Sequence, residues 1–213
     1  MHIKDLQKNE KGNAVFLILI AVGFFWALSY AVTQTGGEGK QDDRERAVVS
    51  ATQIRQYASG LRTSVTRMII TGTESFDLEF DKDGSMPDRE IFNAEGGGAI
   101  EQDPPVNAGI SPKYTYLTPT SKSTGFFVEG VGTDKPDVIL IATGLTANVC
   151  REINKGLELA GNVPKYENPP VQFKSPGKKT GKTTFSAYPG QSFACVRNGA
   201  GDTYVYYHVL AEN

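Results

Sequence analysis

The sequence predicts an α+β protein, in which a long N-terminal helix packs on a mainly antiparallel sheet. Three observations support this prediction. Residues 14–32 form an uncharged apolar run, residues 47–68 repeat apolar side chains at helical spacing, and several short strand-like segments follow residue 113. One long helix followed by strands is typical of an α+β domain, not of alternating βαβ units. The 213 residues leave room for one domain of ordinary size after the apolar run.

The first predicted element is an apolar helix. Residues 14–32 have the sequence AVFLILIAVGFFWALSYAV, and no charged residue lies between Lys11 and Glu38. A helix of about 20 such residues, rising 1.5 Å per residue, spans a hydrocarbon core of about 30 Å. We therefore expect a transmembrane helix over residues 13–34, preceded by a leader over residues 1–12.

The charges around this helix predict its orientation. Lys4, Lys8 and Lys11 precede it, and basic residues of this kind stay in the cytoplasm. The leader is then cytoplasmic, and the chain crosses a bacterial inner membrane once, with residues 43–213 in the periplasm. A cleaved secretory signal is the alternative, because small residues at Ala27, Ser29 and Ala31 suit a signal peptidase. The run is longer than the usual 7 to 15 residues of a signal, which favours a retained anchor.

The N-terminus also resembles a known family. The leader MHIKDLQKNEKG contains lysines, ends in glycine and passes directly into the apolar helix, and in these features the first third of the chain resembles type IV pilins and pseudopilins. The resemblance implies a pilin-like fold, cleavage between Gly12 and Asn13, a structural and non-enzymatic role, and similar pilin-like subunits as partners. An ordinary signal anchor with a glycine at this position is the alternative.

Two positions depart from the family pattern. Asn13 stands where the family usually has an aromatic residue or Met, and Leu17 stands where it usually has Glu. That Glu normally pairs with the terminal amine of a neighbouring subunit inside the membrane, where an unpaired charge is costly. The resemblance therefore implies a minor or assembly component more than the main subunit of a long filament.

A second helix is predicted after a glycine-rich break over residues 35–42. Asp42 and Glu45 have the spacing of a capping box, which predicts the start of the helix. Apolar residues then recur at alternating steps of four and three, and these seven are Ala47, Ala51, Ile54, Ala58, Leu61, Val65 and Met68. This stripe predicts a helix face packed on the sheet of its own domain, or on the helix of another subunit.

An acidic segment follows the second helix. Apolar and acidic residues alternate from Phe76 to Asp81, which predicts an edge strand. Asp81 and Asp83 then resemble the start of a calcium loop, with an ordinary solvated turn as the alternative. Acidic residues predominate over residues 74–103, whereas five lysines lie between 165 and 182. These segments are either solvated loops or complementary patches that set the register of neighbouring subunits.

The second half of the chain predicts the sheet, one short helix and a disulfide. Thr146 is expected to cap a helix that ends at Leu159, and Cys150 and Cys195 are expected to pair in an oxidising compartment. The predicted strands are residues 114–118, 125–131 and 137–142, with a hairpin of residues 192–196 and 203–210. The third of these strands, with its run Val138 to Ile141, is expected to be covered on both faces.

The composition argues against most catalytic and cofactor chemistry. With only two histidines and two cysteines, the chain offers few ligands for metal or triad sites, and we expect no catalytic residue and no cofactor. A balance of 22 basic and 24 acidic residues argues against nucleic acid. Residues 177–183 lack the spacing of a phosphate-binding loop, which argues against a nucleotide. His208 is expected to be packed in an aromatic strand.

The alternative function is an anchored or secreted periplasmic ligand-binding or calcium-binding domain.

Overall fold

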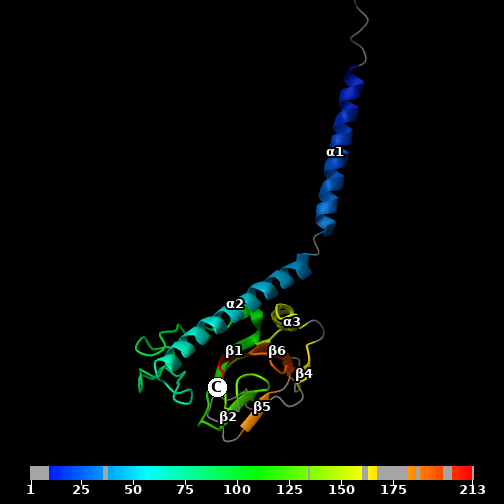
Figure 1. The fold of residues 1–213 in the computed structure, drawn as a ribbon. Coiled ribbons are helices and arrows are strands. Elements are labelled where there is room, and N and C mark those ends of the chain that lie inside the picture. Colours follow the sequence, from blue (N-terminus) through cyan, green and yellow to red (C-terminus); the bar gives the residue numbers. More distant parts are fainter. Residues whose placement is uncertain are drawn as a thin grey trace, which may run out of the picture. The chain divides into compact units, whose positions relative to one another are not determined.

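The computed structural model of the chain describes residues 10–35, 38–133, 135–159, 163–166, 182–185, 188–198 and 203–212. The chain divides into two compact units, Met1–Asp43 and Arg44–Asn213. The described residues of the first unit are helical, and the second unit is an α+β domain (Figure 1). The predicted α+β class is therefore confirmed.

The first helix, α1, covers Glu10–Thr35. Its described side chains, from Val15 to Tyr30, are all exposed. Within the residues that the structure describes, no helix meets both the length and the apolar character of a membrane span. The span expected over residues 13–34 extends at both ends beyond the side chains that are described. The transmembrane helix therefore stays a prediction.

The second helix, α2, covers Glu38–Ile70, so the expected start at Asp42 was wrong. Gly39 lies inside the helix, because one glycine lowers helix stability by only about 1 kcal/mol. All seven residues of the predicted stripe are buried, with at most 4% of their surface exposed. They share one hydrophobic cluster with Val138 and Leu140 of the sheet. Packing on the domain's own sheet is thus confirmed, and α2 lies along one face of that sheet (Figure 1).

The main sheet has five strands in the order β1-β3-β7-β6-β4. Their bounds are β1 Gly109–Leu117, β3 Val138–Leu145, β7 Tyr204–Ala211, β6 Phe193–Asn198 and β4 Lys165–Tyr166. Each neighbouring pair among the first four strands is antiparallel, as predicted, and β4 pairs in parallel with β6. The predicted hairpin is the β6–β7 pair, and its turn lies outside the described residues.

Strand β3 is covered on both faces, as its continuous apolar sequence predicted. Leu140 faces the cluster formed with α2, whereas Ile139 and Ile141 face a second cluster on the other side of the sheet. That second cluster includes Phe126 and Val128 of β2, Gly125–Val128, which pairs in parallel with β5, Lys182–Phe185. The sequence did not predict β4 or β5, because segments this short leave little pattern to detect.

The short helix α3 covers Ala147–Lys155 and begins as predicted, with the Thr146 hydroxyl accepting a hydrogen bond from the Val149 backbone N–H at 3.4 Å. It ends before the expected Leu159. Glu158 adopts a left-handed conformation, with φ of 57°, which a continuing helix does not allow.

The predicted edge strand from Phe76 to Asp81 is wrong. Only an isolated bridge between Glu79 and Glu90 forms there, inside a long irregular region between α2 and β1 that also contains the short 3₁₀ helix η1, Val106–Ala108. The alternating pattern arises because Leu78 is buried and Phe80 stacks on Tyr116 of β1, with ring centres 4.3 Å apart. Because these two inward-facing side chains are two residues apart, the sequence alternates as a strand does, although the segment pairs only through the isolated bridge.

Candidate functional site

A group of three carboxylates forms in the irregular region before β1. One carboxylate oxygen from each of Glu79, Asp83 and Glu90 lies within 4.8 Å of the other two. Asp83 was predicted as a candidate metal ligand, but its predicted companion Asp81 is not part of this group. Glu79 and Glu90 were missed because the calcium-loop pattern is local in sequence, whereas the Glu79–Glu90 bridge joins two separate segments.

Glu90 is the buried member of this acidic group, with no exposed surface. Its Oε1 accepts a hydrogen bond from the Gly84 backbone N–H at 2.7 Å, and its Oε2 accepts one from the Asn93 side chain at 3.1 Å. The following turn packs tightly, because a Cβ on Gly97 would collide with the backbone of Ile91. The chain therefore holds one buried, hydrogen-bonded carboxylate close to two others.

Asp83 is the exposed member of the acidic group. The pKa of its carboxyl is lowered, first by hydrogen bonding with the Ser85 side chain and then with the Ser85 backbone N–H, which donates to Oδ1 at 2.8 Å. Asp83 is thus ionised at neutral pH. Clustered carboxylate oxygens are the ligands that a hard divalent cation such as Ca²⁺ prefers.

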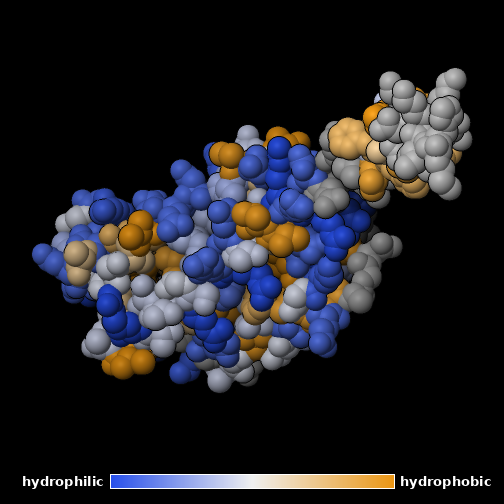
Figure 2. Space-filling view, turned by 90° about the horizontal axis from the view of Figure 1, so that it is seen from above, coloured by the Kyte–Doolittle hydropathy of each residue, from blue (hydrophilic) through white to orange (hydrophobic). Residues whose placement is uncertain are grey.

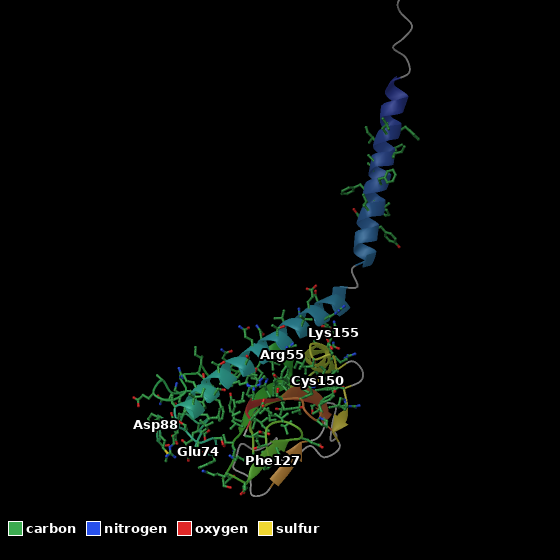
Figure 3. The ribbon with its side chains drawn as sticks, in the orientation of Figure 1. Arg55, Glu74, Asp88, Phe127, Cys150 and Lys155 are labelled. Atoms are coloured by element: carbon green, nitrogen blue, oxygen red, sulfur yellow. A yellow bond between two sulfur atoms is a disulfide. The ribbon has the colours of Figure 1, made fainter. Side chains whose placement is uncertain are left out.

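The predicted disulfide between Cys150 and Cys195 is present and joins α3 to β6, with 5.3 Å between the two Cα atoms. Figure 3 marks Cys150 on α3. One turn further along α3, the Asn154 side chain pairs with the Cys195 backbone: its Nδ2 donates to the carbonyl and its Oδ1 accepts from the N–H, both at 2.8 Å. The Asn154 amide also donates to the Tyr188 hydroxyl at 3.2 Å. Helix and strand are therefore held by covalent and polar contacts at the same place.

His208 lies on the face of β7 that packs against α2, and only 5% of its surface is exposed. Its ring stacks on Phe193 of β6 at 5.0 Å, and its Nδ1 is 2.6 Å from the Tyr206 hydroxyl oxygen. Its Nε2 has no hydrogen-bond partner among the described residues. Burial, followed by the charges of Arg62 and Arg55, lowers the pKa of His208 to about 4. The ring is therefore neutral at pH 7, as a packed aromatic strand predicts.

Two other predicted features lie partly or wholly outside the described residues. Gly12 and Asn13 lie within the backbone of α1, but their side chains are not described, so leader cleavage stays a prediction. Most of the basic segment 165–182 is also outside the described residues. The idea that it complements the acidic segment 74–103 stays a prediction for the same reason.

Comparison with protein-family models, with curated proteins and with solved structures finds no match.

Proposed function

We propose that this chain is a membrane-anchored, non-enzymatic structural or assembly component of a bacterial envelope, of the pilin-like or pseudopilin-like kind. The observation that supports this most directly is the uninterrupted exposure of apolar side chains along α1. Val15, Phe24, Phe25 and Trp26 each expose more than half of their surface, up to 75% for Trp26. An exposed apolar surface of this size marks a site that contacts lipid or protein.

The larger unit has a different surface. Its face in Figure 2 is mostly hydrophilic, with small and separate hydrophobic patches. This contrast fits a water-exposed domain carried by an apolar helix. The Cys150–Cys195 disulfide supports an oxidising compartment such as the periplasm, because structural disulfides are rare in the cytosol of mesophiles.

The membrane orientation is tested with reporter fusions in the full chain. Alkaline phosphatase fused to the C-terminus should be active, because it folds only outside the cytoplasm, and a cytoplasm-dependent fluorescent reporter should be dark. Mass spectrometry of the mature N-terminus separates three forms: cleavage after Gly12, cleavage after Ser29 or Ala31, and no cleavage. The opposite reporter pattern would overturn the envelope location.

Lateral contact between subunits is the second part of the proposal. Ala21, Gly23 and Ala27 lie on α1, and a Cβ on Gly23 would meet no atom within 4 Å in the isolated chain. Small residues let membrane helices approach closely. Leu17 provides no carboxylate to fix the stagger between subunits, so we expect low-copy incorporation in a complex instead of a long homopolymer.

Cysteine cross-linking tests this contact. In a variant in which both native cysteines are replaced, a cysteine at Ala27 should give cross-linked species in membranes at native expression. The additional change Gly23→Leu should abolish them, whereas Gly23→Ala should not. Monomer throughout, with the other envelope components present, would leave a solitary anchor and contradict a role in assembly.

Calcium binding is a second candidate function, favoured by the burial of Glu90 beside Asp83 and Glu79. Calorimetric titration of the purified chain with Ca²⁺ should show one site, weakened at least tenfold by Glu90→Gln. The exposed Asp88 (Figure 3) provides a matched control, because Asp88→Asn should leave binding unchanged. Heat of dilution alone in the unmodified chain would exclude this candidate.

A further inference from the structure

A groove of about 670 Å³ lies in the larger unit between α2, the segment 99–105 and β1. We propose that this groove binds a neutral oligosaccharide, through amide side chains along its rim and a tyrosine pair in its wall. The inference goes beyond the proposed envelope role and does not depend on the membrane anchor. The volume lies within the range of about 300–1,000 Å³ found for small-molecule sites, which leaves space for several pyranose rings.

The helix side of the groove is built by regular spacing along α2. Gln53, Gln56, Gly60 and Ser64 line it, at steps of three, four and four residues, beside the buried stripe. Steps of this kind place side chains on one helix face. A Cβ on Gly60 would meet no atom within 4 Å, so the middle of this face is open because it carries no side chain.

Part of the groove wall is aromatic and held in place, with Tyr57 from α2 and Tyr114 from β1. The rings of Tyr57 and Tyr114 stack with 4.7 Å between their centres. The Tyr57 hydroxyl is 2.9 Å from that of Tyr116 and accepts a hydrogen bond from the Gln102 backbone N–H at 3.4 Å. Burial raises the pKa values of Tyr57 and Tyr114, so both phenols are neutral. A fixed aromatic wall of this kind suits the C–H face of a sugar ring.

The charged groups that line the groove indicate which class of ligand it can bind. Asp103 is the one ionisable carboxylate among its described lining residues, and none of these is Lys or Arg. A phosphate, sulfate or carboxylate ligand would therefore meet repulsion without a compensating cation. The exposed amides of Gln53, Gln56 and Gln102 both donate and accept hydrogen bonds, as do sugar hydroxyls. A neutral polyhydroxylated ligand matches this set of groups.

A basic peptide is the competing ligand, because Asp103 and the neighbouring Glu101 are both exposed. Of these two carboxylates only Asp103 lines the groove, and a peptide bound to them would not use the amides along α2 or the aromatic wall. The saccharide uses all three surfaces, and the experiment separates the two classes.

The test is calorimetric titration of the full chain, purified in a polyoxyethylene detergent so that no sugar headgroup competes. The probes are the tetrasaccharides of β-1,4-linked glucose and of β-1,4-linked N-acetylglucosamine, with tetralysine as the peptide probe. We expect saturable binding of at least one tetrasaccharide and none of tetralysine. Binding of tetralysine alone, or of no probe, would overturn the proposal.

Variants at Gly60 make the test specific to the groove. Gly60→Trp should fill the groove and weaken saccharide binding at least tenfold, whereas Gly60→Ala should keep binding and raise the melting temperature, since Ala favours helix over Gly. Thr66→Trp adds the same bulk on an exposed part of α2 outside the groove and should bind normally. Gln53→Ala and Gln102→Ala should each weaken binding by severalfold. Binding that persists unchanged in folded Gly60→Trp protein would show that the saccharide binds elsewhere.

Discussion

The surroundings of His208 disfavour its protonated form. Arg55 and Arg62 face it from α2, Phe193 covers it from β6, and Tyr206 bonds to it from its own strand. Arg62 is itself paired with Glu212 at 3.0 Å, and Arg55 lies over the Phe193 ring at 5.5 Å. Figure 3 marks Arg55 on α2. Protonation would place a third cation in this group.

This geometry predicts a defined pH dependence of stability. The folded-state pKa of His208, about 4, lies below the unfolded value of 6.5, so the unfolded chain binds the proton more readily. The stabilisation that the neutral His208 ring contributes to the folded state is fully present above about pH 6.5. It is lost as the pH falls toward 4, and the total loss is up to about 3 kcal/mol. Urea unfolding of the unmodified chain across this window should show the slope, and His208→Phe should flatten it. An equal slope in both proteins would assign the effect to carboxylates instead.

The side chain of Asn154 is expected to contribute strongly to stability. Its buried amide satisfies both backbone groups of Cys195, so Asn154→Ala would leave a buried donor and a buried acceptor without partners. We expect a loss of about 2–4 kcal/mol in the free energy of unfolding. The matched control is the exposed Asn148 on the same helix, where Asn148→Ala should change stability by less than about 0.5 kcal/mol. Chemical denaturation with the disulfide intact measures both, and similar values for the two would contradict this role.

At the scale of elements, the α2 stripe supplies much of the larger core. Leu61 is 2% exposed in the cluster shared with the sheet, so Leu61→Ala should lower the free energy of unfolding by about 2–5 kcal/mol. Ile70, at the end of the same helix, is 79% exposed, and Ile70→Ala should have little effect. Thermal melts followed by circular dichroism compare the two. A small loss for Leu61→Ala would mean that the helix–sheet contact is looser than its burial indicates.

The elements that were predicted well have a regular spacing of apolar residues, and the apolar face that this spacing creates packs against another apolar face in the fold. Three examples are the α2 stripe, strand β3 with its two covered faces, and the β6–β7 hairpin. The false strand at Phe76–Asp81 shows the limit, because its alternation is satisfied by loop packing. The acidic group and the groove depend on segments brought together by the irregular region before β1. No local spacing encodes such contacts, so Glu79, Glu90 and Gly60 could not be identified from the sequence.

At the scale of the whole molecule, the division at Asp43 predicts independent folding of the larger unit. A chain of residues 44–213 retains the buried stripe, the sheet and the disulfide. It should melt within about 2–4 °C of the full chain, a difference that corresponds to about 1 kcal/mol for a domain of this size. Its two cysteines should be unreactive toward thiol reagents after oxidative refolding. Failure to fold would show that residues before Arg44 contribute to the core.

The position of β7 has a consequence for biogenesis. This strand, Tyr204–Ala211, follows β6 in the sequence yet lies between β3 and β6, and Glu212 after it pairs with Arg62 of α2. The sheet therefore cannot close until β7 has left the ribosome and, in an exported chain, the translocation channel. Until then β3 and β6 have unpaired edges and the aromatic face that receives α2 is incomplete. A stop codon at Tyr204 would remove a central strand, and quality-control proteases would receive an unfinished sheet instead of a shortened domain.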